Sequence, residues 1–216
     1  FLTIVINMKK QFLVIGALFL VCTMAMCVNQ IQIPDKFFES YGKIETTQKE
    51  IDTLYSSYWE QQTKRIDYVT KNRQTQNVDN KYVLSMLESE VIFLDELAKK
   101  NTIYSNQINE LFGSVNDMKG DEAKTKANKI VISLRKSQQN LANSILRYKT
   151  ASEYVAKNLY YYINNADLTN PLISNDIKNN NLSAKGDFEY GDQFLSEYNL
   201  AKDEANATYQ ELKKLK

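Results

Sequence analysis

Apolar side chains recur at alternating steps of about three and four residues along most of this 216-residue chain. That spacing is the period of an amphipathic helix and is close to a heptad seam. The chain has only six glycines and two prolines, too few for a turn-rich β-sandwich or barrel. The pattern therefore predicts an all-α protein built from long helices.

Four helices account for the pattern. The expected spans are 35–73, 79–118, 121–166 and 187–216. Pro171, Gly186 and a run of three asparagines predict a loop at about 164–186, before the last span. Helices joined by tight turns lie antiparallel and adjacent. We therefore expect an elongated antiparallel, coiled-coil-like bundle of three long helices and a shorter C-terminal fourth.

The seams of the first two helices contain polar interruptions. In the first helix, Gln48 and Gln62 occupy two positions of the apolar seam, and the seam ends with Ile66 and Val69. In the second, the seam is assigned to the following residues: Leu84, Leu87, Val91, Leu94, Ala98, Asn101, Ser105, Ile108, Phe112 and Val115. Antiparallel folding would bring Gln48, Asn101, Ser105 and Ser137 to one height. Buried polar groups need partners, so this layer either fixes the helix register or lines a small polar pocket.

Charge predicts the packing order. The third span is rich in lysine and arginine, whereas the second and fourth have an acidic excess. The third helix should therefore lie between two acidic neighbours, because such rim pairs select the partner helix. The whole chain is nearly balanced at +1, which gives no global attraction to nucleic acid.

The N-terminal region predicts export. Met8-Lys9-Lys10 is followed by an uncharged, mostly apolar run over 12–26, the pattern of a secretory signal or anchor helix. Met8 is the expected start of translation. We therefore assign residues 1–28 to upstream residues plus a signal peptide or membrane anchor, and 29–216 to a single helical domain.

Three fates of this segment fit the sequence. Thr23-Met24-Ala25 suits cleavage and secretion, and an uncut segment would act as an anchor. Met24-Ala25-Met26-Cys27 resembles a prokaryotic lipobox, which implies a lipoprotein attached to the membrane through Cys27. The other cysteine, Cys22, also lies in this segment, so the body is expected to contain no disulfide.

Two further features lie at the end of the third expected helix and beyond it. Consecutive tyrosines at 160–162 cannot all face one core, so Tyr160 and Tyr161 are candidate interaction residues, or they simply cover the end of the bundle. Two glycosylation sequons occur, at Asn181 in the expected loop and at Asn206.

The sequence lacks the residues on which most catalytic mechanisms depend. The chain has no histidine, the commonest general base and metal ligand, and no phosphate-binding or nucleophile motif. No cofactor or metal site is expected. Glu88 and Glu90 are two residues apart and are interpreted as solvated charges.

The sequence thus predicts an extracytoplasmic, membrane-anchored or secreted protein of the cell envelope. A non-enzymatic structural or interaction role with a protein partner is the first hypothesis. The alternative is a ligand-binding or sensory ectodomain with a small polar pocket near Asn101. A hydrolase of unrecognised type is a third hypothesis, which the missing histidine disfavours.

Overall fold

The computed structural model describes residues 31–75 and 77–216, which contain four helices and no strand. The helices are α2 (Asp35–Arg73), α3 (Asn80–Val115), α4 (Asp121–Ile163) and α5 (Pro171–Lys213). The predicted all-α class is therefore confirmed for this part of the chain. The predicted signal or anchor, with Cys27, lies outside the described residues. The longest helices have 43 residues, which corresponds to about 65 Å.

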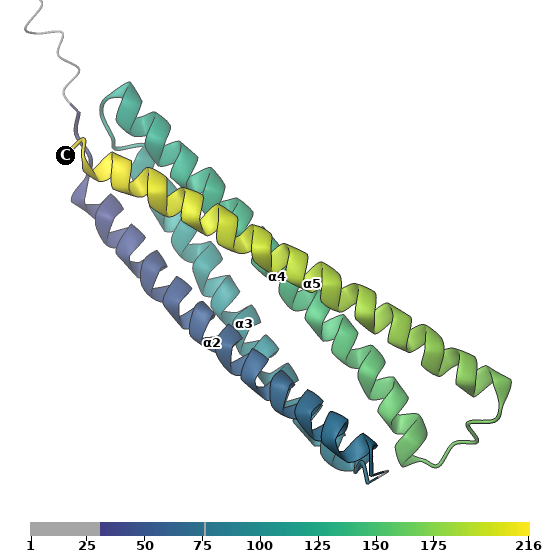
Figure 1. Cartoon of the computed structure of the whole chain (residues 1–216). Helices are drawn as coiled ribbons and strands as arrows, with labels where there is room; N and C mark the ends of the chain where they lie inside the picture. Colours follow the sequence, from purple (N-terminus) through teal and green to yellow (C-terminus); the bar gives the residue numbers. More distant parts are fainter. Residues whose placement is uncertain (1–30, 76) are drawn as a thin grey trace, which may run out of the picture.

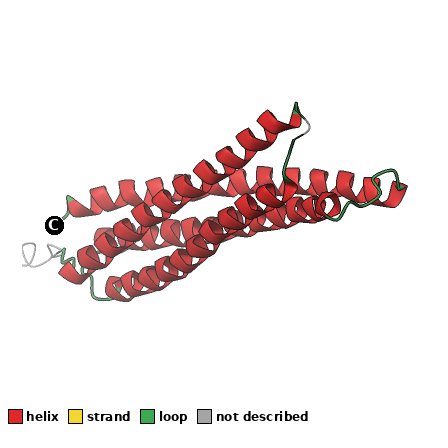
Figure 2. Cartoon of the chain, turned by 90° about the horizontal axis from the view of Figure 1, so that it is seen from below, coloured by secondary structure: helices red, strands yellow, loops and turns green. Residues whose placement is uncertain are grey.

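Successive helices run antiparallel and form an elongated bundle (Figure 1). Residue 31, the α3–α4 turn and the C-terminus lie at one end, called the proximal end, and the α2–α3 turn and the α4–α5 loop lie at the distal end. α4 packs against both α3 and α5, and α2 packs against α3. α2 and α5 approach each other in the proximal half and diverge in the distal half, as Figures 1 and 2 both show.

The turns at the two ends of α3 have clear local causes. The Asp79 carboxylate accepts hydrogen bonds from the backbone nitrogens of Lys81 and Tyr82, at 2.9 and 3.2 Å, and so caps α3 where the sequence predicts its start. Gly120 precedes α4 with a φ of 93°, a left-handed conformation that favours glycine. Backbone hydrogen bonds between Gln32 and Lys119 fasten this turn to the segment before α2.

The predicted loop at 164–186 and short fourth helix are wrong. The loop covers only residues 164–170, and α5 begins at Pro171. Proline has no backbone donor to lose in a first turn, and the Asn170 side chain accepts a hydrogen bond from Leu172 N. The asparagine run continues the helix because the buried side chain of Asn158 on α4 binds both Asn180 and Asn181. These contacts outweigh the intrinsic preference of asparagine for turns.

The core is a heptad seam that alternates steps of three and four residues. On α2 the predicted seam positions Gln48 and Gln62 are buried, but Ile66 is 50% exposed and Arg65 takes the buried position. On α3 the buried seam lies one residue away from the predicted one at several positions. Its members are Val83, Leu87, Glu90, Leu94, Leu97, Asn101, Tyr104, Ile108, Leu111 and Val115.

The predicted charge order is confirmed. The basic helix α4 lies between α3 and α5 and forms ion pairs with both. Lys126 lies 2.8 Å from Glu211 of α5, and Lys149 pairs with Asp95 of α3. These pairs are exposed and add little stability each, but they agree with the arrangement of the helices.

Candidate functional site

A buried polar layer crosses the proximal half of the bundle. Gln48 Nε2 donates to the Tyr104 hydroxyl over 3.0 Å, and that hydroxyl donates to Ser137 Oγ over 3.3 Å. Tyr104 is fully buried, and this burial raises the pKa of Tyr104 to about 12. Three helices are therefore joined by hydrogen bonds at this height, with Tyr104 as the central residue.

The layer differs from the one predicted at Gln48, Asn101, Ser105 and Ser137. Gln48 and Ser137 do meet, but through Tyr104, which was not among the predicted residues. Asn101 is buried, and its Oδ1 has no hydrogen-bond partner among the described residues. Ser105 is only half-buried and lines a shallow surface cavity of about 270 Å³ with Arg135. A seam that is counted from Val83 in alternating steps of four and three residues includes Tyr104.

A second set of buried hydroxyls joins α2, α4 and α5 further along the bundle. The Tyr55 hydroxyl donates to Ser144 Oγ over 3.1 Å, and Ser144 donates to the Gly191 carbonyl over 2.9 Å. Tyr148 lies against Gly191, where an added Cβ would come within 2.6 Å of the tyrosine ring. The Tyr148 hydroxyl donates to Asp192. Burial raises the pKa of Tyr148 further than that hydrogen bond does.

An ion pair is buried between α2 and α3 in the distal half. Arg65 Nε and Nη2 lie 2.5 and 3.0 Å from the two carboxylate oxygens of Glu90. Glu90 is fully buried, so its interpretation as a solvated charge is wrong. Burial raises the pKa of Glu90, and the Arg65 guanidinium opposes that shift. Both residues occupy seam positions, and this was the signal available in the sequence.

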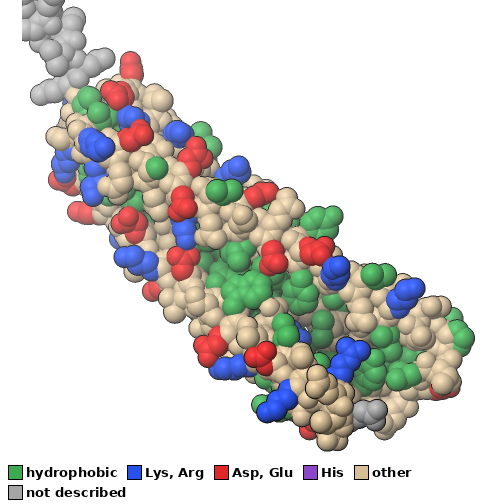
Figure 3. Space-filling model, in the orientation of Figure 1, with side chains coloured by type: hydrophobic (Ala, Val, Ile, Leu, Met, Phe, Trp, Pro, Cys, Tyr) green, Lys and Arg blue, Asp and Glu red, His purple; other side chains and the backbone are tan. Residues whose placement is uncertain are grey.

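The distal groove is a hollow of about 580 Å³ between the diverging helices. Its lining comes from all four helices and the α2–α3 turn: Arg65, Val69, Arg73, Val78, Asn80, Val83, Val155, Asn158, Leu159, Tyr162 and Asn181. Figure 3 shows apolar and basic side chains gathered around a depression in this half of the molecule. The groove combines an apolar floor with two guanidinium groups.

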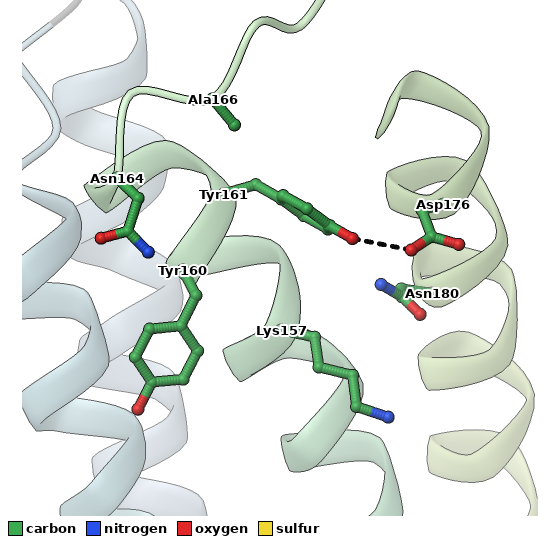
Figure 4. Close-up of a pocket in the computed structure, with 7 residues that line it drawn as sticks. All are labelled: Lys157, Tyr160, Tyr161, Asn164, Ala166, Asp176 and Asn180. Carbon is green, nitrogen blue, oxygen red and sulfur yellow. Dashed lines mark hydrogen bonds between the residues drawn. The ribbon is translucent and has the colours of Figure 1, made fainter. Parts of the chain in front are cut away.

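The tyrosine pocket, of about 510 Å³, lies between the end of α4 and the start of α5 (Figure 4). The Tyr161 hydroxyl donates to Asp176 Oδ2 over 2.7 Å, and this hydrogen bond raises the pKa of Tyr161. Tyr160 points away from Asp176 and is 50% exposed. Lys157 and Asn180 complete the polar side of the pocket. Tyr160 and Tyr161 thus lie at an accessible end of the bundle.

The two sequon asparagines both lie on α5. Asn181 was expected in a loop, and that placement is wrong. The Asn181 side chain accepts a hydrogen bond from Asn158, and the Asn206 side chain accepts one from the Tyr41 hydroxyl. Each amide oxygen is therefore engaged in a contact between helices, and glycosylation at either site stays a prediction.

The described part of the chain contains no group of three or more Cys, His, Asp or Glu residues that could hold a metal ion. None of α2 to α5 combines the length and apolar composition needed to cross a membrane. No protein-family model, curated protein or solved structure matches the chain. A functional proposal therefore depends on the geometry of the bundle.

Proposed function

We propose that this chain is a non-enzymatic interaction protein of the cell envelope, membrane-anchored or secreted through its N-terminal segment. The distal half of its bundle would bind a protein partner. The observation that supports this most strongly is the hollow at that end, where α2 and α5 diverge (Figures 1 and 2) and Val155, Asn158 and Leu159 of α4 line the groove. A rod that served only as a spacer would have no need of an open end.

The direction of the chain supports an outward-facing distal end. Residue 31 enters the bundle at the proximal end, where Gln32 is fastened to Lys119. An anchor within residues 1–28, or a lipid on Cys27, would hold that end near the membrane. The distal end would then lie up to about 65 Å away, one helix length.

Exposed aromatic side chains gather at the same end. Tyr160 and Tyr162 on α4 and Tyr82 on α3 are each 41–50% exposed. Tyrosine supplies a large apolar surface and a hydroxyl at little conformational cost, so it is frequent among residues that dominate binding energy. These side chains are the contacts that the proposed partner would use.

Composition supports a non-enzymatic role without a cofactor, since the chain contains no histidine. The alternative of a polar pocket near Asn101 has one observation in its favour, the unpartnered Oδ1 of Asn101. Asn101 does not line any of the three cavities described above. The layer around Tyr104 is therefore better explained as a device that fixes helix register.

The partner surface is tested by photo-crosslinking in the natural host. A benzoylphenylalanine in place of Tyr160 should give one discrete adduct. The matched control replaces Ile132, which is 66% exposed at the proximal part of the same helix, and should give none. Equal adducts at both positions, or none at Tyr160, would contradict a distal binding surface.

The cellular placement has its own test. Intact mass of the protein from its natural host should reveal cleavage, a diacylglyceryl group on Cys27, or an uncut chain in the membrane fraction. An uncut, unmodified chain in the cytoplasmic fraction would refute the envelope assignment.

A further inference from the structure

The distal groove has the composition of a site for a small amphiphile. Its volume of about 580 Å³ lies within the range of roughly 300–1,000 Å³ that is usual for small-molecule sites. The apolar part of the lining comes mainly from Val69, Val83, Val155 and Leu159. Val83, Leu87 and Leu159 form a small core beneath it. The groove is therefore formed mainly by packed helices, and the α2–α3 turn contributes only Val78.

The charge on the lining is positive. Arg65 and Arg73 line the groove, and no aspartate or glutamate does. Glu90 neutralises Arg65 through two hydrogen bonds. Arg73 has no ion-pair partner in the described part of the chain and is exposed at the end of α2. One guanidinium is thus free at the edge of an apolar trough.

We propose that the distal groove binds a single-chain amphiphilic carboxylate, with its alkyl chain along the valines and Leu159 and its head group on Arg73. A guanidinium presents a planar pair of donors that matches the two oxygens of a carboxylate. The side-chain amides of Asn80 and Asn181 lie in the same lining and supply further polar contacts. The groove shares Tyr162 with the proposed partner surface, whereas Tyr160 lines the neighbouring tyrosine pocket. Tyr160 therefore reports on the protein partner, and Arg73 reports on the ligand.

Calorimetric titration of the purified body (29–216), the described bundle with two preceding residues, tests the site with three probes of equal chain length. Below micelle formation, decanoate should bind with one-to-one stoichiometry, decanol should bind more weakly, and decyltrimethylammonium should not bind. Arg73→Gln should weaken decanoate binding about tenfold, because a charge-assisted hydrogen bond is lost. Binding of decanol should change little in that variant.

Matched variants separate the groove from the general surface. Lys71→Gln removes the same charge from a residue of α2 that does not line the groove and should leave decanoate binding unchanged. Asn80→Trp should fill the groove and abolish binding, whereas Lys81→Trp, one residue further on, should not. Circular dichroism checks that each variant keeps its helices.

Several results would overturn the proposal. Decanoate binding that is absent, or equally weakened by Arg73→Gln and Lys71→Gln, would show that the groove is not a carboxylate site. Concentration-dependent dimerisation that is lost in Asn80→Trp, without decanoate binding, would assign the groove to a second copy of the chain. If only the crosslink at Tyr160 were absent, the proposed protein partner would be refuted and the ligand site would stand.

Discussion

The proximal and distal halves of this bundle are closed by different means. In the proximal half, the rings of Tyr41 on α2 and Tyr209 on α5 stack with centroids 3.6 Å apart. In the described residues, all hydrogen bonds and ion pairs that join α2 to α5, or to Lys216 just after it, involve α2 residues 35–52. In the distal half the two helices diverge, and the contacts of Arg65 with Glu90 and of Asn158 with α5 lie beside a small apolar core.

The two halves therefore differ in how their helices are held together and in how open their surface is. A large apolar and aromatic core, crossed by the polar layer around Tyr104, closes the proximal half. The distal half has a small apolar core and specific polar contacts, and residues of α4 line the groove between the diverging helices. One seam of constant period therefore supports a tight core at one end and an open groove at the other.

Alkaline pH should have the largest effect, because it acts on the tyrosines of the closed core. Burial raises the pKa of Tyr104 from 10 to about 12 and raises the pKa of Tyr41 and Tyr198 as well. A raised tyrosine pKa stabilises the folded state fully below pH 10, and that contribution is lost as the pH rises through about 12. Helix content and tyrosinate absorbance should therefore change together above pH 10. Complete tyrosinate formation with the helices intact would contradict a closed core.

Breaking the distal ion pair should have the next largest effect. Glu90→Gln leaves the buried Arg65 charge uncompensated and should lower the free energy of unfolding by about 3–5 kcal/mol in urea titration. Glu88→Gln, an exposed neighbour, should change it by less than about 0.5 kcal/mol. The double variant Arg65→Met/Glu90→Leu should recover most of the loss. Equal effects of the two glutamine variants would show that the pair is not buried.

Two glycines of α5 differ in the space around them: one packs closely against another helix, and the other faces open space. Gly191→Ala places a Cβ 2.6 Å from the Tyr148 ring and should cost about 1–3 kcal/mol through overpacking. Gly186→Ala meets no atom within 4 Å and should stabilise the helix by about 0.5–1 kcal/mol. Opposite signs in thermal unfolding are expected, and equal signs would mean that Tyr148 does not pack there.

Asn101→Leu tests the buried layer and should have the smallest effect. Its Oδ1 is buried without a partner, and an unpartnered polar atom costs about 1–3 kcal/mol. Thermal stability should therefore stay the same or rise. A large loss of stability would indicate a buried water or ligand on Asn101 and would revive the pocket hypothesis.

Much of the fold was readable from the sequence, because seam period and caps act locally. α2 begins at Asp35 as predicted, and α3 begins at Asn80, one residue after the predicted start at Asp79. The start of α5 was missed because Pro171 was interpreted as a loop residue together with the asparagine run, although proline is favoured in the first turn of a helix. Only the tertiary contact with Asn158 shows why the asparagine run remains helical.

The site was less predictable, since it depends on which polar residues occupy the seam. Starting the α3 seam at Leu84 assigned Ser105 and Phe112 to the core, although Phe112 is 40% exposed. The same choice hid Tyr104 and Glu90, whose roles appear only when the facing helices are in place. The distal groove arises from the divergence of α2 and α5, which no local pattern records.

Native-state hydrogen exchange along α5 tests the central claim most directly, because one helix passes through both halves. Amides of residues 198–212, in the closed half, should exchange at least about a hundredfold more slowly than amides of residues 175–183, which pack only against α4. Uniform protection from 175 to 212 would show that the distal half is as closed as the proximal half and would contradict the account.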